Sequence, residues 1–142
     1  MSTTTIVGSA PGKTAGMRHI ALFVHNLEET QRFYTSLLGM DIEWQPDEDN
    51  IYLTSGNDNL ALHRSDLSGQ ELAAKQRLDH IGFIIDTMAD VDRWHDFFCD
   101  NGVAIAQAPK THRDGARSFY CRDPAGTLVQ LIYHPPISSG VL

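Results

Sequence analysis

With 142 residues, 42% of them hydrophobic, the chain is long enough for one globular domain or for two small half-domains that share a core. A formal net charge of −7 and only 11 dispersed Lys and Arg residues argue against a nucleic-acid surface, which needs clustered positive charge. No apolar run approaches the roughly 20 residues of a membrane helix, and the N-terminal residues lack the regions of a secretory signal. We therefore expect a cytoplasmic protein whose partners are small molecules or proteins.

Residues 1–16 are mostly small and polar and are expected to form a mobile leader. Beyond them the chain divides into two halves that resemble each other. The stretch MRHIALFV at 17–24 recurs as LDHIGFII at 78–85, so that His19 falls on His80. We expect a first module at residues 17–64, a linker at 65–77 that can form a short helix, a second module at 78–135 and a tail at 136–142.

Each half has the same order of predicted elements. An apolar strand is followed by a helix that begins at a polar cap, Asn26 or Thr87, and ends at a glycine, Gly39 or Gly102. Three strand-like stretches follow, which are DIEWQ, NIYLTS and NLALHR in the first half and VAIAQ, ARSFYC and TLVQLIYH in the second. The pattern predicts an α+β fold in which two βαβββ modules form curled mixed sheets around an open cup.

Alternation along the first strand of each half places His19 and His80 on the face opposite the aliphatic residues. The aliphatic faces are expected to lie under the helices, which leaves the histidines on the concave side of the sheets. A small residue, Ala21 or Gly82, stands two positions after each histidine. Two imidazoles that face a common hollow are suited to a divalent metal ion, although each could instead hydrogen-bond within the core.

The order of HIALFV, NLEETQRFYTSLLGM, DHIGFII and SFYCRDPAGTLVQL resembles the vicinal oxygen chelate superfamily over residues 17–134. This group includes glyoxalase I, fosfomycin resistance proteins, methylmalonyl-CoA epimerase, type I extradiol dioxygenases and metal-free bleomycin-binding proteins. The resemblance implies metal ligands at His19, His80 and Gln130, where the last position is usually glutamate, with Fe, Mn, Ni or Zn as the ion. The matching position of the first half falls on Ala61 or, if the register moves by two residues, on His63.

The glutamine changes the expected chemistry. Gln130 offers a carbonyl oxygen to a metal ion but cannot accept a proton, which weakens a glyoxalase mechanism. His63 is therefore our preferred additional residue, either as a ligand or as a proton acceptor. Tyr120 is a candidate proton donor, by resemblance to extradiol dioxygenases.

Candidate substrate contacts lie in and around the stretch PKTHRDGAR at 109–117, which is expected to be a mobile loop that can close over the cup. Lys110 and Arg113 supply local positive charge that suits an anionic ligand. By resemblance to fosfomycin resistance proteins, Lys110, Ser118 and Tyr120 would touch substrate. The predicted substrate-binding residues are Phe23, Lys110, Arg113, Ser118, Tyr120 and His134, with His134 at the rim of the cup.

The sequence thus predicts a metal-dependent lyase or dioxygenase that binds two neighbouring oxygens of a small substrate, with His63 and Tyr120 as catalytic residues. The alternative is a metal-free small-molecule-binding protein resembling the bleomycin resistance proteins, in which Phe23 and Tyr120 contact an organic ligand. A homodimer is expected. The residues leave open whether a site lies within one chain or is shared between two.

Overall fold

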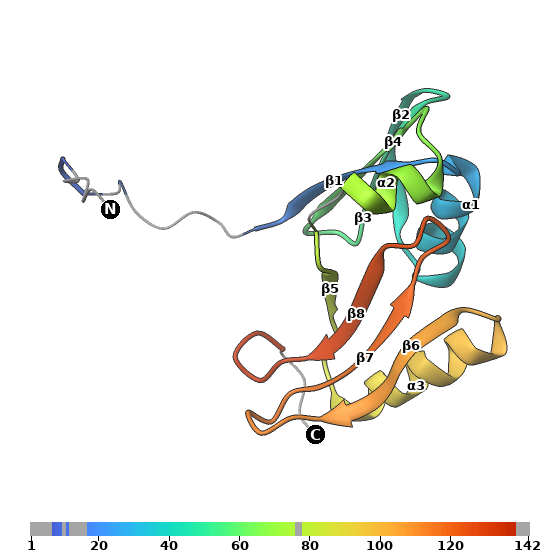
Figure 1. Cartoon of the computed structure of the whole chain (residues 1–142). Coiled ribbons are helices and arrows are strands. Elements are labelled where there is room, and N and C mark those ends of the chain that lie inside the picture. Colours follow the sequence, from blue (N-terminus) through green and yellow to red (C-terminus); the bar gives the residue numbers. More distant parts are fainter. Residues whose placement is uncertain (1–6, 10, 12–16, 76–77, 139–142) are drawn as a thin grey trace.

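The computed structural model of the chain describes residues 7–9, 11, 17–75 and 78–138. Most of the leader expected at 1–16, together with residues 76–77 of the linker and 139–142 of the tail, lies outside this part. Within it, the elements follow one another in the same order in both halves (Figure 1). Among the described residues, no helix combines the length and the apolar character needed to cross a bilayer.

Two four-stranded sheets form the framework of the molecule. The first has the order β1-β4-β3-β2 and the second the order β5-β8-β7-β6. In each sheet the first strand of the module, β1 or β5, lies at one edge and runs parallel to its neighbour. The other pairs of strands are antiparallel. This confirms the α+β fold of two βαβββ modules with mixed sheets. The strands are β1 (His19–Val24), β2 (Asp41–Asp47), β3 (Asn50–Thr54), β4 (Asn59–Arg64), β5 (Ile81–Ile84), β6 (Ala104–Thr111), β7 (Arg117–Arg122) and β8 (Leu128–Tyr133).

The helices begin and end close to the predicted residues. The first consists of α1 (Leu27–Arg32) and a π-helical turn, η1 (Phe33–Leu37), the linker contains α2 (Gly69–Lys75), and the second module contains α3 (Met88–Asp100). Gly39 and Gly102 follow the two main helices with φ of 83° and 71°, which are left-handed conformations that glycine adopts without strain.

The two predicted caps differ. Thr87 accepts a hydrogen bond from the backbone N–H of Asp90 at 3.1 Å, as a capping side chain does. Asn26 stands at the expected position but makes no side-chain cap bond. Its amide instead donates to the carbonyl oxygen of Pro124 at 2.9 Å, because the turn between β7 and β8 lies against this helix end. The capping role predicted for the Asn26 side chain is therefore wrong.

One hydrophobic core spans both modules. The aliphatic face of each sheet contributes to it, and so do the helices, with Phe33 lying 5.8 Å from Phe98 and Tyr34 lying 6.2 Å from Phe83 between ring centroids. The opposite faces of the sheets remain open. On the first sheet, Phe23 is 68% exposed and Trp44 is 59% exposed on this open side. The histidines at the strand starts therefore lie away from the helices, as predicted.

The stretch at 109–117 differs from the expected mobile loop. Strand β6 continues to Thr111 and pairs with β7, with Lys110 opposite Ser118. The remaining turn is short and is closed by a hydrogen bond from the His112 N–H to the Ala116 carbonyl oxygen at 2.7 Å. Strand pairing thus places Lys110 on the sheet rather than on a lid, and it leaves Arg113 in an exposed turn.

Candidate functional site

Strand register identifies equivalent positions in the two modules. Ala21, two residues after His19, lies opposite Ala61, and Gly82, two residues after His80, lies opposite Gln130. The first-half counterpart of Gln130 is therefore Ala61, whose methyl group cannot bind a metal ion.

His63 occupies a different row of the first sheet. It lies opposite Phe23, whereas Asn59 lies opposite His19. Four residues of strand separate the two rows, which corresponds to about 13 Å. The register has no irregularity between these strands. At this separation His63 and His19 do not share one metal ion.

The hydrogen bonds of His19 fix the position of its proton. Its Nδ1 lies 2.7 Å from Oδ1 of Asn59, and the amide nitrogen of Asn59 donates to Glu43 at 2.8 Å. Because a carboxylate only accepts, the Asn59 amide must turn its nitrogen to Glu43 and its oxygen to the imidazole. Nδ1 of His19 therefore carries the proton, and Nε2 keeps its lone pair when the ring is neutral.

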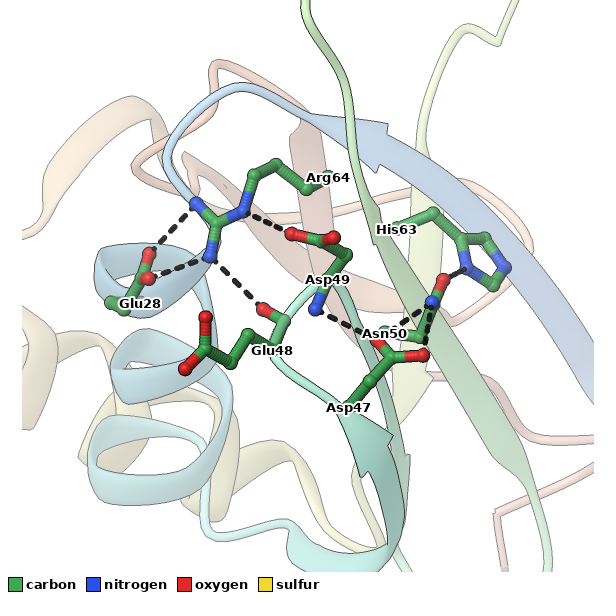
Figure 2. Close-up of polar contacts among 7 residues, drawn as sticks. All are labelled: Glu28, Asp47, Glu48, Asp49, Asn50, His63 and Arg64. Atoms are coloured by element: carbon green, nitrogen blue, oxygen red, sulfur yellow. Dashed lines mark hydrogen bonds and ion pairs between the residues drawn. The ribbon is translucent and has the colours of Figure 1, made fainter.

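His63 has an analogous arrangement, which Figure 2 shows. Its Nδ1 lies 2.6 Å from Oδ1 of Asn50, and the Asn50 amide nitrogen donates to the Asp47 carboxylate at 2.9 and 3.1 Å. In the second module Nδ1 of His80 lies 2.6 Å from a carboxylate oxygen of Asp79. When its ring is neutral, each of the three histidines thus presents Nε2 as an acceptor. Histidines that bind metal ions commonly have this kind of outer partner.

Arg64 anchors the turn that carries Asp47 and Asn50. Its guanidinium donates to both carboxylate oxygens of Glu28, at 2.6 and 3.1 Å, and to Asp49 at 3.0 Å (Figure 2). These hydrogen bonds lower the pKa of Glu28, so the carboxylate stays charged in mildly acidic solution. The start of α1 is thereby tied to the β2–β3 turn that orients His63.

Gln130 and Tyr120 lie beside His80 on the second sheet. The Gln130 amide nitrogen donates to the Ser118 hydroxyl at 3.1 Å, and its oxygen Oε1 lies next to Gly82, 3.7 Å from where a Cβ would stand. Tyr120 is directly opposite Gln130, and its ring lies 5.4 Å from that of His80. Ser118 is only 2% exposed, so it acts on the site through the Gln130 amide that it holds.

A cleft of about 620 Å³ lies where the two modules meet. Arg18 and Ile20, on either side of His19, line it together with Ile81 and Gly82, which directly follow His80. His19, His80 and Gln130 are not among the residues that line this cleft, and Ile20 and Ile81 line it from the faces of β1 and β5 opposite the histidines. Asn59, the hydrogen-bond partner of His19, also lines it.

The remaining predicted contact residues are spread over the open faces. Phe23 lies beside His63, with 6.0 Å between ring centroids. Lys110 and Arg113 are exposed, and His134 is half-buried directly after β8. Arg117, which lies near them, is paired with Asp92 at 2.7 Å.

Sequence reasoning missed the residues that orient the histidines. Asp79 directly precedes His80, and this proximity is a signal that the sequence does offer. Asn50 and Asn59 could not be found in this way, because they reach His63 and His19 only through strand pairing. The aromatic neighbours Trp44 and Tyr52, stacked with centroids 5.2 Å apart, were likewise hidden until the sheet order was known.

The donor set suits a divalent ion held by neutral ligands. Among the described residues, no three His, Cys, Asp or Glu side chains are grouped to hold a metal ion. His19, His80 and Gln130 instead offer two imidazole nitrogens and one amide oxygen, each with its other polar atom already bound. Three protein ligands that leave a position open are typical of catalytic zinc sites. Each of these atoms is thus of a type that binds divalent ions, although none belongs to a carboxylate that would strengthen the binding.

The duplicated βαβββ modules, each with its own mixed four-stranded sheet, define the class of fold. The chain belongs to the glyoxalase/bleomycin resistance protein/dioxygenase superfamily, whose family model matches residues 16–131. The family resemblance seen in the sequence is thereby confirmed.

Solved structures share this fold. A glyoxalase/dioxygenase from Nostoc punctiforme is 25% identical with a TM-score of 0.74, and the match covers 93% of this chain and 99% of that chain. A lactoylglutathione lyase from Agrobacterium tumefaciens is 21% identical with a TM-score of 0.69, covering 86% and 96%. A fosfomycin resistance protein from Mesorhizobium loti is 21% identical with a TM-score of 0.65, covering 85% and 93%.

Proposed function

We propose that the chain is a divalent-metal-dependent enzyme, a lyase or a dioxygenase, that acts on a small molecule with two neighbouring oxygens. His19, His80 and Gln130 would hold the ion. The observation that carries this proposal is the proton position on the two imidazoles. Their Nδ1 atoms are bound to Asn59 and Asp79, so both leave Nε2 free to bind a metal.

The chain's own residues have distinct roles in this proposal. A bound divalent ion supplies a Lewis acid for the two substrate oxygens. His63 accepts a proton at Nε2, because Asn50 and Asp47 keep the other ring proton on Nδ1. Tyr120, beside the His80 ring, donates a proton from its hydroxyl group. Lys110 and Arg113 attract the anionic part of a substrate.

We also propose that two copies of the chain form a homodimer. The strands of the first sheet carry three carboxylates, at Asp41, Glu43 and Asp47, and Arg64 as their one Lys or Arg. The strands of the second sheet carry Lys110 and Arg122 and no carboxylate, and their third basic residue, Arg117, is already paired with Asp92 of α3. Because all three carboxylates lie on the edge strand β2, opposite charges favour contact between β2 of one copy and the second sheet of the other.

Metal binding by untagged protein tests the proposed function. After treatment with a chelator, the protein is titrated with Mn²⁺, Fe²⁺, Ni²⁺ and Zn²⁺, and bound metal is measured by mass spectrometry. We expect one ion per chain for at least one metal, and loss of that ion in His19→Ala and in His80→Ala. His25→Ala, at an exposed position between β1 and α1, is the matched control and should keep the ion. Failure of the wild-type protein to bind any of these metals contradicts the proposal.

A metal-free binding protein is the second candidate, and Ala61 is the observation that favours it. This residue stands where the first module would supply the equivalent of Gln130, so that module offers only His19 to an ion. In this case the histidines, Phe23 and Tyr120 contact an organic ligand directly.

A further inference from the structure

The open face of the first sheet carries a continuous group of aromatic rings, formed by Phe23, His63, Tyr52 and Trp44. We call this group the aromatic face. Each ring comes from a different strand of the sheet. Phe23 and His63 have centroids 6.0 Å apart, His63 and Tyr52 are also 6.0 Å apart, and Tyr52 is stacked on Trp44 at 5.2 Å.

The aromatic face is exposed. Phe23 is 68% exposed although the alternate residues of β1 are buried or half-buried, and Trp44 is 59% exposed on β2, where every residue is exposed. Scattered exposed aromatics are common in soluble proteins, but contiguous apolar surface usually marks a binding site. Ala21 and Ala61, side by side in the row next to Phe23 and His63, add no bulk that would cover these rings.

The polar groups around the aromatic face are acceptors. His63 presents the lone pair of Nε2, because its Nδ1 proton is directed to Asn50. The carboxylates of Glu43 and Asp47 lie on the same side of the sheet, each accepting a hydrogen bond from an asparagine amide. Arg64, the one Lys or Arg of these four strands, is occupied by Glu28 and Asp49.

From these observations we infer that the aromatic face binds a planar aromatic cation bearing N–H donors. The rings provide stacking surfaces, and the flat face of tryptophan attracts positive charge. The acceptors at the edge match N–H groups, whereas an anion would face the carboxylates of β2. The inference names a class of ligand for one part of the small-molecule site described under the proposed function. It rests on the proposed function only for the location of that site.

Proflavine, a planar cation with two amino groups, is the probe, and acridine-9-carboxylate is the ring-matched anion. Binding is followed by fluorescence in EDTA at about 0.15 M salt, where long-range attraction to a negatively charged protein is screened. We expect proflavine to bind about tenfold or more tightly than the anion. Phe23→Ala and Trp44→Ala should each weaken proflavine binding by about tenfold, since each removes one stacking surface without changing the charge. Phe97→Ala, at a 43% exposed position on α3, is the control and should bind as the wild type does.

Equal affinity for the two probes, or unchanged proflavine binding in Phe23→Ala and Trp44→Ala, overturns the inference. It is also overturned if proflavine does not bind and Trp44→Ala lowers the molecular mass in sedimentation, because the face is then an interface between copies. EDTA separates this test from that of the proposed function. Proflavine binding with the expected pattern in a protein that takes up no metal rejects the metal enzyme and leaves the aromatic face standing.

Discussion

Gln130 sets the charge of the candidate metal site. Its amide is held by Ser118, which leaves the carbonyl oxygen Oε1 beside Gly82. Together with two neutral imidazoles this makes a ligand set without formal charge. A carboxylate in the same place would attract a divalent ion more strongly, because two opposite charges in contact attract each other even when water weakens the interaction.

Gln130→Glu should therefore bind the metal ion about tenfold more tightly than the wild type, and isothermal titration calorimetry measures the change. The Ser118 hydroxyl can donate to a glutamate oxygen, so the side chain keeps its support. Gln70→Glu, at an exposed position on α2, adds the same charge away from the site and should leave the affinity unchanged. Equal affinities in the wild type and Gln130→Glu would remove Gln130 from the ligand set.

At the residue scale, the sequence predicted where the histidines lie but not most of the partners that fix their protons. The strand alternation correctly placed His19 and His80 away from the helices. Asp79 was within reach of a sequence reading because it is adjacent to His80. Asn59 and Asn50 were not, because their contacts with His19 and His63 depend on which strands pair and in which register.

At the scale of elements, the predicted strands and helix ends follow from local patterns, whereas the loop at 109–117 does not. Alternation and glycine positions are local signals and survive folding. The stretch PKTHRDGAR is polar and resembles a loop, but pairing of Lys110 with Ser118 and of Thr111 with Arg117 extends β6 into it. Such strand pairing depends on the partner strand, here β7, and a local sequence pattern does not predict it.

The two helix caps show the same difference. Both Asn26 and Thr87 precede their helices at the correct position, but only Thr87 caps its helix through the side chain. Asn26 has a competing acceptor in the other module, the carbonyl oxygen of Pro124. The position of a cap is thus a local property, and the partner of its side chain is a tertiary one.

Thr87→Ala should lower the free energy of unfolding by about 1 kcal/mol, because the N–H of Asp90 loses its acceptor at the start of α3. Urea denaturation measures the loss. Thr87→Ser keeps the hydroxyl and should recover most of the stability. If the alanine and serine variants were equally stable, the hydrogen bond seen at 3.1 Å would contribute nothing to the helix.

At the scale of the whole molecule, a buried polar contact joins the two modules. The Tyr34 hydroxyl from η1 donates to Asp123 at 2.8 Å, in the turn between β7 and β8. The other oxygen of Asp123 accepts from the backbone N–H groups of Ala125 and Thr127. The internal repeat predicted the two modules, but the contact between them involves residues 89 positions apart and became visible only in the fold.

Burial raises the pKa of Asp123 above its ordinary value of 3.8, since the charged form loses hydration in the core. The native state therefore holds the proton to a higher pH than the unfolded chain does. The stability gained from this proton is fully present below pH 3.8 and is lost as the pH rises through the raised native pKa.

Asp123→Asn should remove this pH dependence. The asparagine oxygen can accept from Ala125 and Thr127, and its amide can donate to the Tyr34 hydroxyl, so the three hydrogen bonds are kept without a buried charge. In urea denaturation at a series of pH values, the wild type should lose stability relative to the variant as the pH rises from 3.8 towards neutrality. Asp66→Asn, which removes an exposed carboxylate in the linker, should instead follow the wild-type profile. If the free energies of unfolding of the wild type and Asp123→Asn changed in parallel with pH, Asp123 would bind its proton equally well in the folded and the unfolded chain. The contact between the modules would then contain no buried charge that destabilises the fold.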